Sequence, residues 1–483
     1  LSIAPARFRD LMNAPELALY RRTLEQTERE RPHTLSEKEE RILGMSGDAF
    51  STSHTVFSKL NDADPRFPKI KDSSGKEVEI THANYISFLE SPDRRVRRDA
   101  FNALYGVYES FGNTFAAILE GTVKVGVLSA KLRNFPGARA AALFPDAIDE
   151  SVYDGLIDAI HARLPLLHRY MSLRARKLGL QKLEMYDILN PLAPRPAASF
   201  SWDEAKRIVR DALGVFGQDY VRTLDRAFEE RWIDVFECRG KRSGAYSGGC
   251  YGKPPFVLLN FTGSLDSVFT LAHELGHSMH TWHSNSSQPY HCAGYRIFAA
   301  EVASTTNELL LHHHLMKTSD DPSFQVGLLT HLLDMIRATV FRQTQFAEFE
   351  RDIYAMKEGD EPLTADSLCA KYREINAAYY GPCVNDTPPI RWEWARIPHF
   401  HYDFYVYKYA TGLSAAAKLS RDILDGKTEA YRRFLCAGDT KDPLDLLRDA
   451  GVDFSTPEPV EAAMELFRSA LDDLEARLAP ERP

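Results

Sequence analysis

The sequence predicts a mainly α-helical protein whose 483 residues fold into more than one lobe. Apolar side chains recur at helical spacing over most of the chain. Strand-like patterns occupy only two short segments, and chains longer than about 250–300 residues seldom form a single hydrophobic core. A composition of 44% hydrophobic and 26% charged residues is typical of a globular protein. We therefore expect a small β-sheet within an otherwise helical architecture.

Residues 1–85 are predicted to form an N-terminal helical region that also contains a short hairpin. A polar amphipathic pattern begins at Glu37 and indicates a helix. Two alternating segments, Lys69–Lys71 and Val78–Ile80, flank a Ser-Ser-Gly turn at residues 73–75, which is typical of a hairpin.

Residues 86–475 are predicted to form a second, larger domain of two helical lobes. Its first helix is expected to start beside Asp93, which follows a Ser-Pro pair. A lobe boundary is predicted near residues 190–200, where three prolines make a stiff connector. Ser201 is then expected to cap the next helix together with Glu204.

The composition changes after Lys241. Residues 243–255 contain four glycines and two prolines, so a helix cannot persist there. The apolar run Phe256–Phe261 is predicted to be a strand. Helical patterns then return and end in an amphipathic stretch at Val460–Leu478.

Charge and cysteine usage narrow the class of protein. A formal net charge of −9 argues against a nucleic-acid partner, because phosphate binding needs basic patches. No apolar stretch is long enough for a membrane helix, and the N-terminus lacks the layout of a signal peptide. The six cysteines are too sparse for a disulfide scaffold. We expect a cytoplasmic protein with no nucleic-acid or membrane partner; the sequence leaves a monomer and a homodimer both open.

The strongest functional signal is residues 273–277, His-Glu-Leu-Gly-His. Positions i and i+4 of a helix lie on one face about 6 Å apart, so two imidazoles placed there can hold one Zn²⁺. An apolar seam lies on nearly the opposite face of the same helix. We therefore expect His273 and His277 to be zinc ligands that face a cleft or solvent, with Glu274 as the catalytic base.

A third protein ligand is expected from a separate helix, and Glu301 fits that role. It belongs to a polar stripe on an otherwise apolar helix, which is either a solvated face or a buried functional face. We assign Glu301 as the ligand and expect Thr305 or Glu308 to orient a ligand imidazole.

Other nearby side chains are weaker candidates for ligands. Cys292 would produce a different coordination type. The residues of His312–His314 point about 100° apart, so they cannot share one ion well and are expected to be a cluster on the helix surface. His280 and His283 are expected to be structural.

The predicted chemistry is metal-assisted hydrolysis of a peptide bond. Three protein ligands leave the fourth position of the zinc for a water whose pKa falls towards about 7. Glu274 takes a proton from this water and returns it to the leaving amine. The oxyanion that forms needs further donors. Tyr402, Tyr405 and Tyr409 recur with Gly412 at helical spacing, which predicts either a wall of phenol donors or an aromatic core stripe.

Four segments of the chain resemble the oligoendopeptidase F branch of the thimet oligopeptidase family of zinc metallopeptidases. They are Lys241–Gly249, Phe269–His280, Phe298–Ser304 and Ala395–Gly412. Softer similarity extends over most of the chain. Together the four segments are highly specific.

The resemblance implies a fold in which two helical lobes enclose a deep substrate channel, with the small sheet beside the zinc helices. It implies one Zn²⁺ per chain and substrates that are short unfolded oligopeptides. It places His399, Tyr402 and Tyr409 near the oxyanion and the substrate carbonyls, and Tyr405 among the substrate-binding residues.

The same resemblance assigns roles to the segment rich in glycine and to the strand after it. The strand Phe256–Phe261, including Leu259, would pair with the substrate backbone by strand addition. The loop with Gly248 and Gly249 would close over the substrate.

Three features depart from the family pattern. Family members have roughly a hundred more N-terminal residues, so residues 1–85 are expected to be a truncated N-terminal domain and one wall of the channel to be incomplete. Asp403 stands where Asn is expected, and Cys250 stands where Ser is more usual.

The function predicted from the sequence is therefore a zinc metalloendopeptidase for oligopeptides. The first alternative is a dipeptidyl carboxypeptidase with the same chemistry, which needs a basic residue to anchor the substrate carboxylate. The sequence alone cannot place such a residue. A catalytically silent peptide-binding protein is the less favoured alternative, because every catalytic position is intact.

Overall fold

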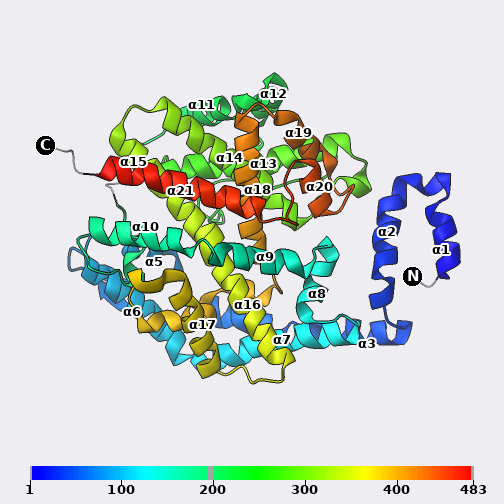
Figure 1. Ribbon diagram of the computed structural model, residues 1–483, viewed down its shortest axis with the longest axis horizontal. Helices are drawn as coiled ribbons and strands as arrows, with labels where there is room; N and C mark the ends of the chain where they lie inside the picture. The colour runs from blue at the N-terminus through cyan, green and yellow to red at the C-terminus, as the bar shows by residue number, and fades with distance from the viewer. Residues whose placement is uncertain (1–2, 193–198, 480–483) are drawn as a thin grey trace.

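The computed structural model of the chain describes residues 3–192 and 199–479, and α-helices dominate it (Figure 1). The predicted mainly α class is confirmed. Within these ranges no helix has both the length and the apolar character needed to cross a membrane. Most of the predicted connector, residues 193–198, lies outside the described residues.

One group of helices occupies the lower half of Figure 1 and comes mainly from the first part of the chain. Its helices are α3 (Glu37–Phe50), α4 (Thr52–Asp62), α5 (His82–Leu89), α6 (Arg94–Ser110), α7 (Gly112–Leu132), α8 (Ala138–Leu143), α16 (Arg342–Glu358) and α17 (Ala365–Tyr380). Two further helices, α9 (Glu150–His161) and α10 (Leu164–Lys177), lie between this group and the next; both pack against the C-terminal helix as well.

The second group occupies the upper half of Figure 1. Its helices are α11 (Trp202–Ala212), α12 (Gln218–Glu229), α13 (Leu265–Ser287), α14 (Ile297–Thr318), α15 (Pro322–Ile336), α18 (Tyr407–Leu424), α19 (Thr428–Ala437), α20 (Pro443–Asp449) and α21 (Glu458–Leu478). Helix α14 packs against both α13 and α18, so these three helices form the centre of the group.

The N-terminal helices α1 (Pro5–Met12) and α2 (Arg21–Glu30) stand at the side of both groups in Figure 1. Arg22 on α2 forms an ion pair with Asp442, at the start of α20, over 2.6 Å. Just after α2, Nδ1 of His33 donates a hydrogen bond to the carbonyl oxygen of Arg133, which follows α7. The α2 segment therefore contacts the upper and the lower group.

The chain passes between the two groups more than once. Helix α15 continues through a π-helical segment, Arg337–Phe341, directly into α16 and so leads from the upper group to the lower one. The chain returns to the upper group at α18. The predicted boundary near residues 190–200 therefore describes only the first crossing, because residues distant in sequence complete each group.

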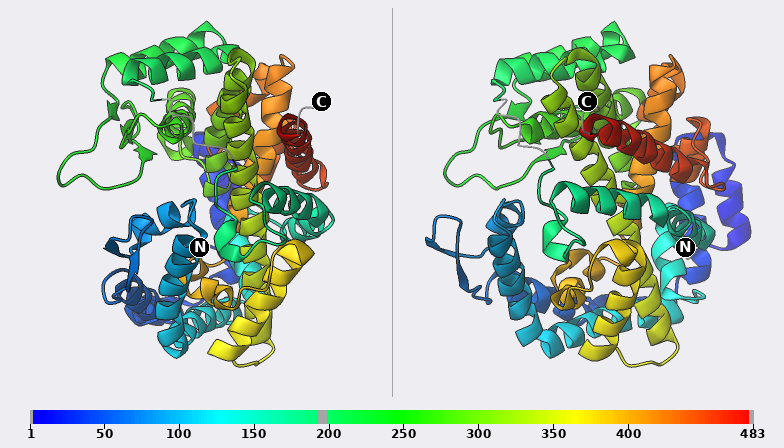
Figure 2. Two further views of the ribbon diagram at one scale, coloured as in Figure 1. Left: turned by 90° about the vertical axis from the view of Figure 1, so that its left-hand side faces the viewer. Right: turned by 60° about the vertical axis from the view of Figure 1, so that its left-hand side comes forward.

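Two small sheets are present in the described residues. The predicted hairpin is confirmed: β1 (Lys69–Lys71) pairs antiparallel with β2 (Glu77–Glu79), and it protrudes from the lower group in the right panel of Figure 2. The second sheet has the order β3-β5-β4, in which β5 (Phe256–Leu258) lies between β3 (Ile233–Asp234) and β4 (Tyr246–Gly248). The strand predicted from Phe256 thus ends three residues earlier than expected.

Local capping signals correctly predicted two helix starts. The Asp93 side chain accepts a hydrogen bond from the backbone N–H of Arg95 at the start of α6. Ser201 and Glu204 form a reciprocal capping box at the start of α11. Both arrangements satisfy backbone donors that the first helical turn leaves unpaired.

The contact between α13 and α14 is unusually close at Gly276. A Cβ atom on Gly276 would lie 2.5 Å from the Cα of Ser304 and 2.7 Å from the carbonyl oxygen of Ala303. Any side chain at this position would force the two helix backbones apart. The seam predicted on α13 packs against the core, since Val268 and Leu275 are fully buried.

We expect Gly276→Ala to lower the free energy of unfolding by about 1–3 kcal/mol, because an added methyl overpacks a backbone contact that cannot yield. Urea denaturation followed by circular dichroism measures this change. Gly155→Ala is the matched control, since Gly155 also lies inside a helix but an added Cβ there meets nothing within 4 Å. The control should gain about 0.5–1 kcal/mol. Equal stability of the two variants would contradict the proposed constraint.

Candidate metal centre

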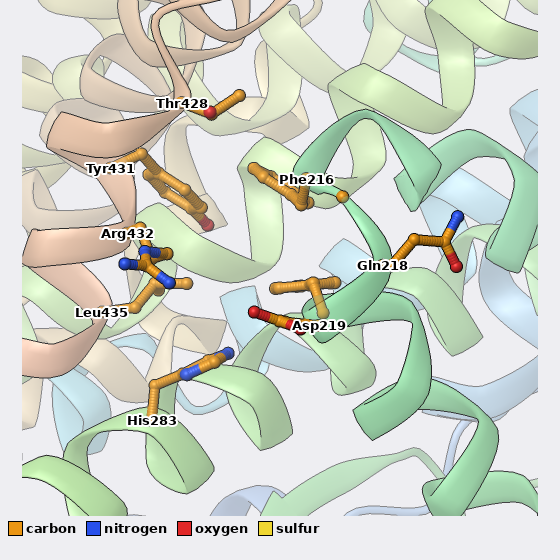
Figure 3. A pocket seen from close by; sticks show the side chains of 10 residues that line it. Phe216, Gln218, Asp219, His283, Thr428, Tyr431, Arg432 and Leu435 are labelled. Carbon is orange, nitrogen blue, oxygen red and sulfur yellow. The ribbon is translucent and has the colours of Figure 1, made fainter.

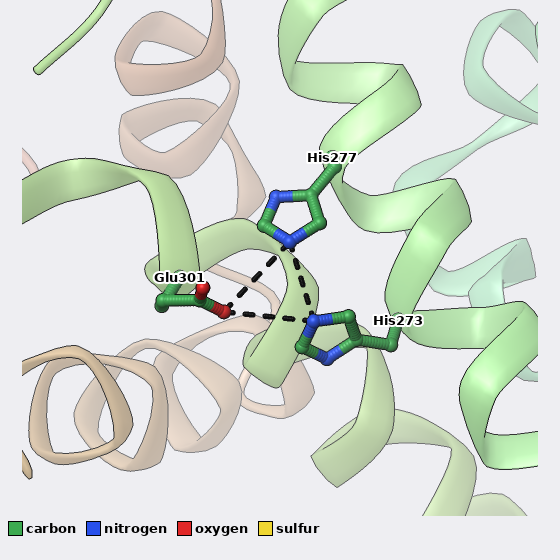
Figure 4. A group of neighbouring side chains, drawn as sticks. All are labelled: His273, His277 and Glu301. Atoms are coloured by element: carbon green, nitrogen blue, oxygen red, sulfur yellow. Dashed lines mark hydrogen bonds and ion pairs between the residues drawn. The ribbon is translucent and has the colours of Figure 1, made fainter. Parts of the chain in front are cut away.

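Three side chains from α13 and α14 converge on one point (Figure 4). The Nε2 atoms of His273 and His277 lie 3.2 Å apart. Glu301 reaches in from α14, and its Oε2 lies 3.5 Å from Nε2 of His273 and 3.7 Å from Nε2 of His277. The side chains are 18–28% exposed, so the group is accessible to a small molecule.

These separations fit a single tetrahedral metal ion. Ligand atoms about 2.0–2.1 Å from a tetrahedral zinc lie about 3.3 Å from one another. The three observed separations cluster around that value. Two imidazoles and one carboxylate also form a donor set that leaves one position of a catalytic zinc open. The residues present therefore suit Zn²⁺.

Glu308 fixes the orientation of the His273 ring. Its Oε1 lies 2.6 Å from Nδ1 of His273, so Nδ1 carries the proton and Nε2 faces the centre. Burial alone would lower the pKa of His273, but the hydrogen bond and charge of Glu308, with Glu301 and Glu274, raise it to about 9. The carboxylates around His273 thus favour a positive charge at this position. Thr305, the other residue expected near the ligands, is buried and makes no side-chain hydrogen bond within the described residues.

Glu274 lies between the two histidines in sequence and is 5% exposed. Burial raises the pKa of its carboxyl to about 7, and the backbone of Ser247 on β4 partly opposes this shift. Its Oε2 is buried and has no hydrogen-bond partner in the described part of the chain. A carboxyl that titrates near neutral pH can both accept and release a proton there.

The residues expected near the oxyanion gather around His399. Its Nε2 lies 3.2 Å from the phenol oxygen of Tyr409, and its ring centroid lies 5.8 Å from that of Tyr405 and 6.1 Å from that of Tyr402. Tyr409 lies on α18 three positions before Gly412, where a Cβ would be 3.1 Å from the Cβ of Glu301, so this cluster borders the metal centre.

The predicted single helical stripe of tyrosines is wrong. Helix α18 begins only at Tyr407, so Tyr402 and Tyr405 precede it. Asp403 and Phe404 have φ values of 35° and 56°, which interrupt any helix. This turn folds back and so brings the three tyrosines together. Helical spacing does not position Tyr402 and Tyr405, because both precede α18.

Helix α16 braces that turn. The backbone N–H of Phe404 donates to Oε1 of Glu350 over 2.7 Å, and the phenol of Tyr354 donates to Oδ1 of Asp403 over 2.7 Å. Both α16 side chains are buried. Sequence reasoning missed them, because their partners lie about fifty positions further along the chain.

The sheet beside α13 differs from the expectation for substrate binding. Strand β5 is central and already paired on both sides, so it cannot add a substrate strand. Leu259 is 1% exposed, and its N–H donates to the carbonyl oxygen of Asp234. The outer strands are β3 and β4; β4 carries Gly248, and its Ser247 lies near Glu274. Gly249 follows at the end of β4, with Pro255 3.2 Å from where its Cβ would be.

The other histidines weighed as ligands, and Cys292, do not belong to the metal group found in the described part of the chain. His312 is 8% exposed, which corrects the predicted surface cluster for that residue. His280 is buried and stacks on Tyr295, with ring centroids 3.7 Å apart. His283 lines a separate cavity of about 320 Å³ between α12 and α19 (Figure 3).

Comparison with known proteins identifies close relatives. The sequence matches the family model of Peptidase family M3 over residues 87–466 and that of Oligopeptidase F over residues 1–67. It is 45% identical to Oligopeptidase PepF of Bacillus subtilis, with 97% of this chain and 70% of the relative covered. It is 45% identical to an Oligoendopeptidase F homolog of Lactococcus lactis, with 92% and 74% covered. The crystal structure of oligoendopeptidase-F from Enterococcus faecium superposes with a TM-score of 0.82 at 38% identity, with 99% of this chain and 81% of that chain covered.

We expect the buried carboxyl of Glu350 to make stability fall as pH rises. Burial, with the charge of Asp403 adding to it, raises the pKa of Glu350 to about 8, well above its value in an unfolded chain. The contribution of the protonated carboxyl to the free energy of unfolding is therefore fully present at and below about pH 4. It is lost as pH rises towards 8. Glu350→Gln keeps an acceptor for Phe404 but cannot ionise.

Melting temperatures of wild type and Glu350→Gln across pH 5 to 9 test this expectation. The variant should gain stability relative to wild type as pH rises. A difference between the two proteins that stays constant with pH would refute it.

Proposed function

Since the chain belongs to peptidase family M3, a family of metallo-oligopeptidases, we propose that it is a zinc-dependent endopeptidase that cleaves short unfolded peptides. The observation that carries the proposal is the convergence of His273, His277 and Glu301 at tetrahedral ligand spacing. Bound zinc supplies Lewis acidity, which acidifies a water molecule and polarises a carbonyl group.

In this proposal Glu274 is the proton carrier. It takes a proton from the attacking water and delivers it to the amine of the leaving peptide. Its pKa near 7 and its unpartnered Oε2 support that role, because the carboxyl can change protonation state without breaking another hydrogen bond. Glu308 keeps the Nε2 lone pair of His273 directed at the metal.

We assign the phenol and imidazole groups of the tyrosine cluster to the developing oxyanion. Tyr409 is hydrogen-bonded to His399 and lies near Glu301, which supports a donor role for both side chains. Tyr402 is 51% exposed, so it can contact a bound peptide. A preorganised hydrogen-bond donor stabilises a developing negative charge most strongly where water is excluded.

We place the substrate backbone along the outer edge of β4. Strand β4 is an outer strand of its sheet, and Ser247 lies beside Glu274, so an added strand would run past the proposed catalytic carboxyl. Only an extended, unfolded segment can pair in this way, which supports oligopeptides as substrates. The six cysteines are free thiols, which suits the reducing cytoplasm.

We expect Glu274→Gln to lower kcat by roughly 10²–10⁴-fold, because proton transfer by the carboxyl is lost while the three ligands remain. Mass spectrometry of a mixed peptide set, combined with metal analysis of the protein, measures both properties. Chelator should abolish cleavage by wild type, and added zinc should restore it. Undiminished peptide loss in the variant would exclude this mechanism.

We expect Glu308→Gln to weaken zinc affinity by about 10–100-fold, because the amide holds the His273 ring less strongly than a carboxylate does. Competition with a chromogenic chelator reports the affinity directly. The control is Glu429→Gln, an exposed substitution on α19 that should bind zinc like wild type. Wild-type affinity in Glu308→Gln would remove Glu308 from this role.

A further inference from the structure

A second cavity of about 200 Å³ lies in the lower group, lined by α5, α6, the π-helical segment and the 3-10 segment Pro388–Arg396. Its walls are mainly apolar and aromatic, yet they include the guanidinium groups of Arg337, Arg342 and Arg396 and one carboxylate, Glu393. This volume suits one amino-acid residue better than a drug-sized molecule.

The arginines at this cavity outnumber their partners. Arg342 and Arg396 share the single carboxylate of Glu393. Arg337, which also lines the cavity, shares the single carboxylate of Asp334 with Arg174, which does not line it. Four guanidinium groups thus pair with two carboxylates in the described structure, which leaves two positive charges.

Burial makes this surplus significant. Arg174, Arg337 and Glu393 are at most 6% exposed, so water screens their charges poorly. A buried charge without a full partner is costly, and an anion in the cavity would relieve that cost.

Two of the arginines still offer donors to the cavity. Arg342 donates through one Nη to Glu393, and its side chain is 23% exposed. Arg396 donates to Tyr105 and Glu393, and its side chain is 21% exposed. A guanidinium carries five N–H groups in a planar fork that matches a carboxylate.

The cavity adjoins the proposed catalytic groups. Arg396 precedes His399 by three positions, and the charge of Arg342, after burial, lowers the pKa of the His399 imidazole. The His399 ring in turn contacts Tyr409, which borders Glu301. The cavity and the His399 cluster are therefore joined by the short stretch of chain between Arg396 and His399.

The backbone at the cavity wall is also unusual. Arg337 and Ala338 belong to the π-helical segment that interrupts the long helix formed by α15 and α16. Such segments are rare and frequently occur at functional sites. Here the wider turn places Arg337 and Arg342 on the same cavity.

We propose that this cavity binds the C-terminal carboxylate of the peptide substrate through Arg342 and Arg396. The inference rests on the proposed peptidase function and deepens it. The apolar walls then surround the last side chain of the peptide, while the carboxylate offsets the surplus charge. The enzyme would choose its scissile bond by distance from the end of the peptide, which accounts for a preference for short substrates.

The test compares two peptides of one sequence, free of Asp and Glu, that end in a carboxylate or in a carboxamide. Wild-type zinc enzyme should cleave the acid with a kcat/KM about ten- to a hundredfold higher, mainly through KM, because charge-assisted hydrogen bonds are lost in the amide. Equal values for the two peptides would overturn the proposal.

Arg342→Gln should bring the ratio of acid to amide cleavage close to one. The variant is expected to fold, because Arg396 remains to pair with Glu393; its melting temperature checks this. Arg342→Lys, which keeps the charge, should retain part of the preference. Arg391→Gln is the matched control, since Arg391 lies in the same 3-10 segment but pairs with Glu109. It should keep the wild-type ratio.

Two further arms separate the remaining outcomes. An amidated peptide ending in Asp tests whether a side-chain carboxylate serves equally; if it does, the assignment to the peptide terminus is wrong. Binding of the acid and amide peptides to Glu274→Gln protein is measured without turnover. If neither peptide is cleaved by wild type, the proposed function fails, while tighter binding of the acid that Arg342→Gln abolishes still supports the pocket.

Discussion

The backbone contact between α13 and α14 at Gly276 is the constraint on which the site depends. The two histidines of the proposed metal site lie on one helix and Glu301 on the other, so the spacing between the histidines and Glu301 is set by the distance between the helices. A buried hydrogen bond from Asn307 to the carbonyl oxygen of Ala272 holds the same contact. On the far side of α14, Gly412 lets α18 approach Glu301, because a Cβ there would lie 3.1 Å from the Cβ of Glu301. Small residues thus bring three helices together around one charged group.

The sequence predicted what depends on local pattern. The placement of His273 and His277 on one face of α13, the buried seam of that helix and the caps of α6 and α11 follow from interactions within a few residues, and these were correct. Glu301 required a second helix whose packing no local rule describes; its isolated polar stripe and the resemblance of Phe298–Ser304 to the family indicated it.

The errors share a different cause. The turn at Asp403 and Phe404 is held by Glu350 and Tyr354 from a distant helix, so helical spacing gave the wrong backbone for Tyr402. The strand from Phe256 was expected to offer an edge, but β3 and β4 enclose it. Pairing order, burial and shared counter-ions are properties of the tertiary structure, and this also explains why the arginine-lined cavity had no signal in the sequence.

The braced turn has a consequence for the local dynamics of the chain. A left-handed conformation at a residue other than glycine costs about 1–2 kcal/mol, so the turn relaxes whenever its bonds to α16 open. The amide of Phe404 exchanges its hydrogen with solvent only in that open state, because its hydrogen bond to the Glu350 carboxyl is buried. The exchange rate of this single amide, at a residue that is 1% exposed, therefore measures how often the tyrosine cluster loses its arrangement.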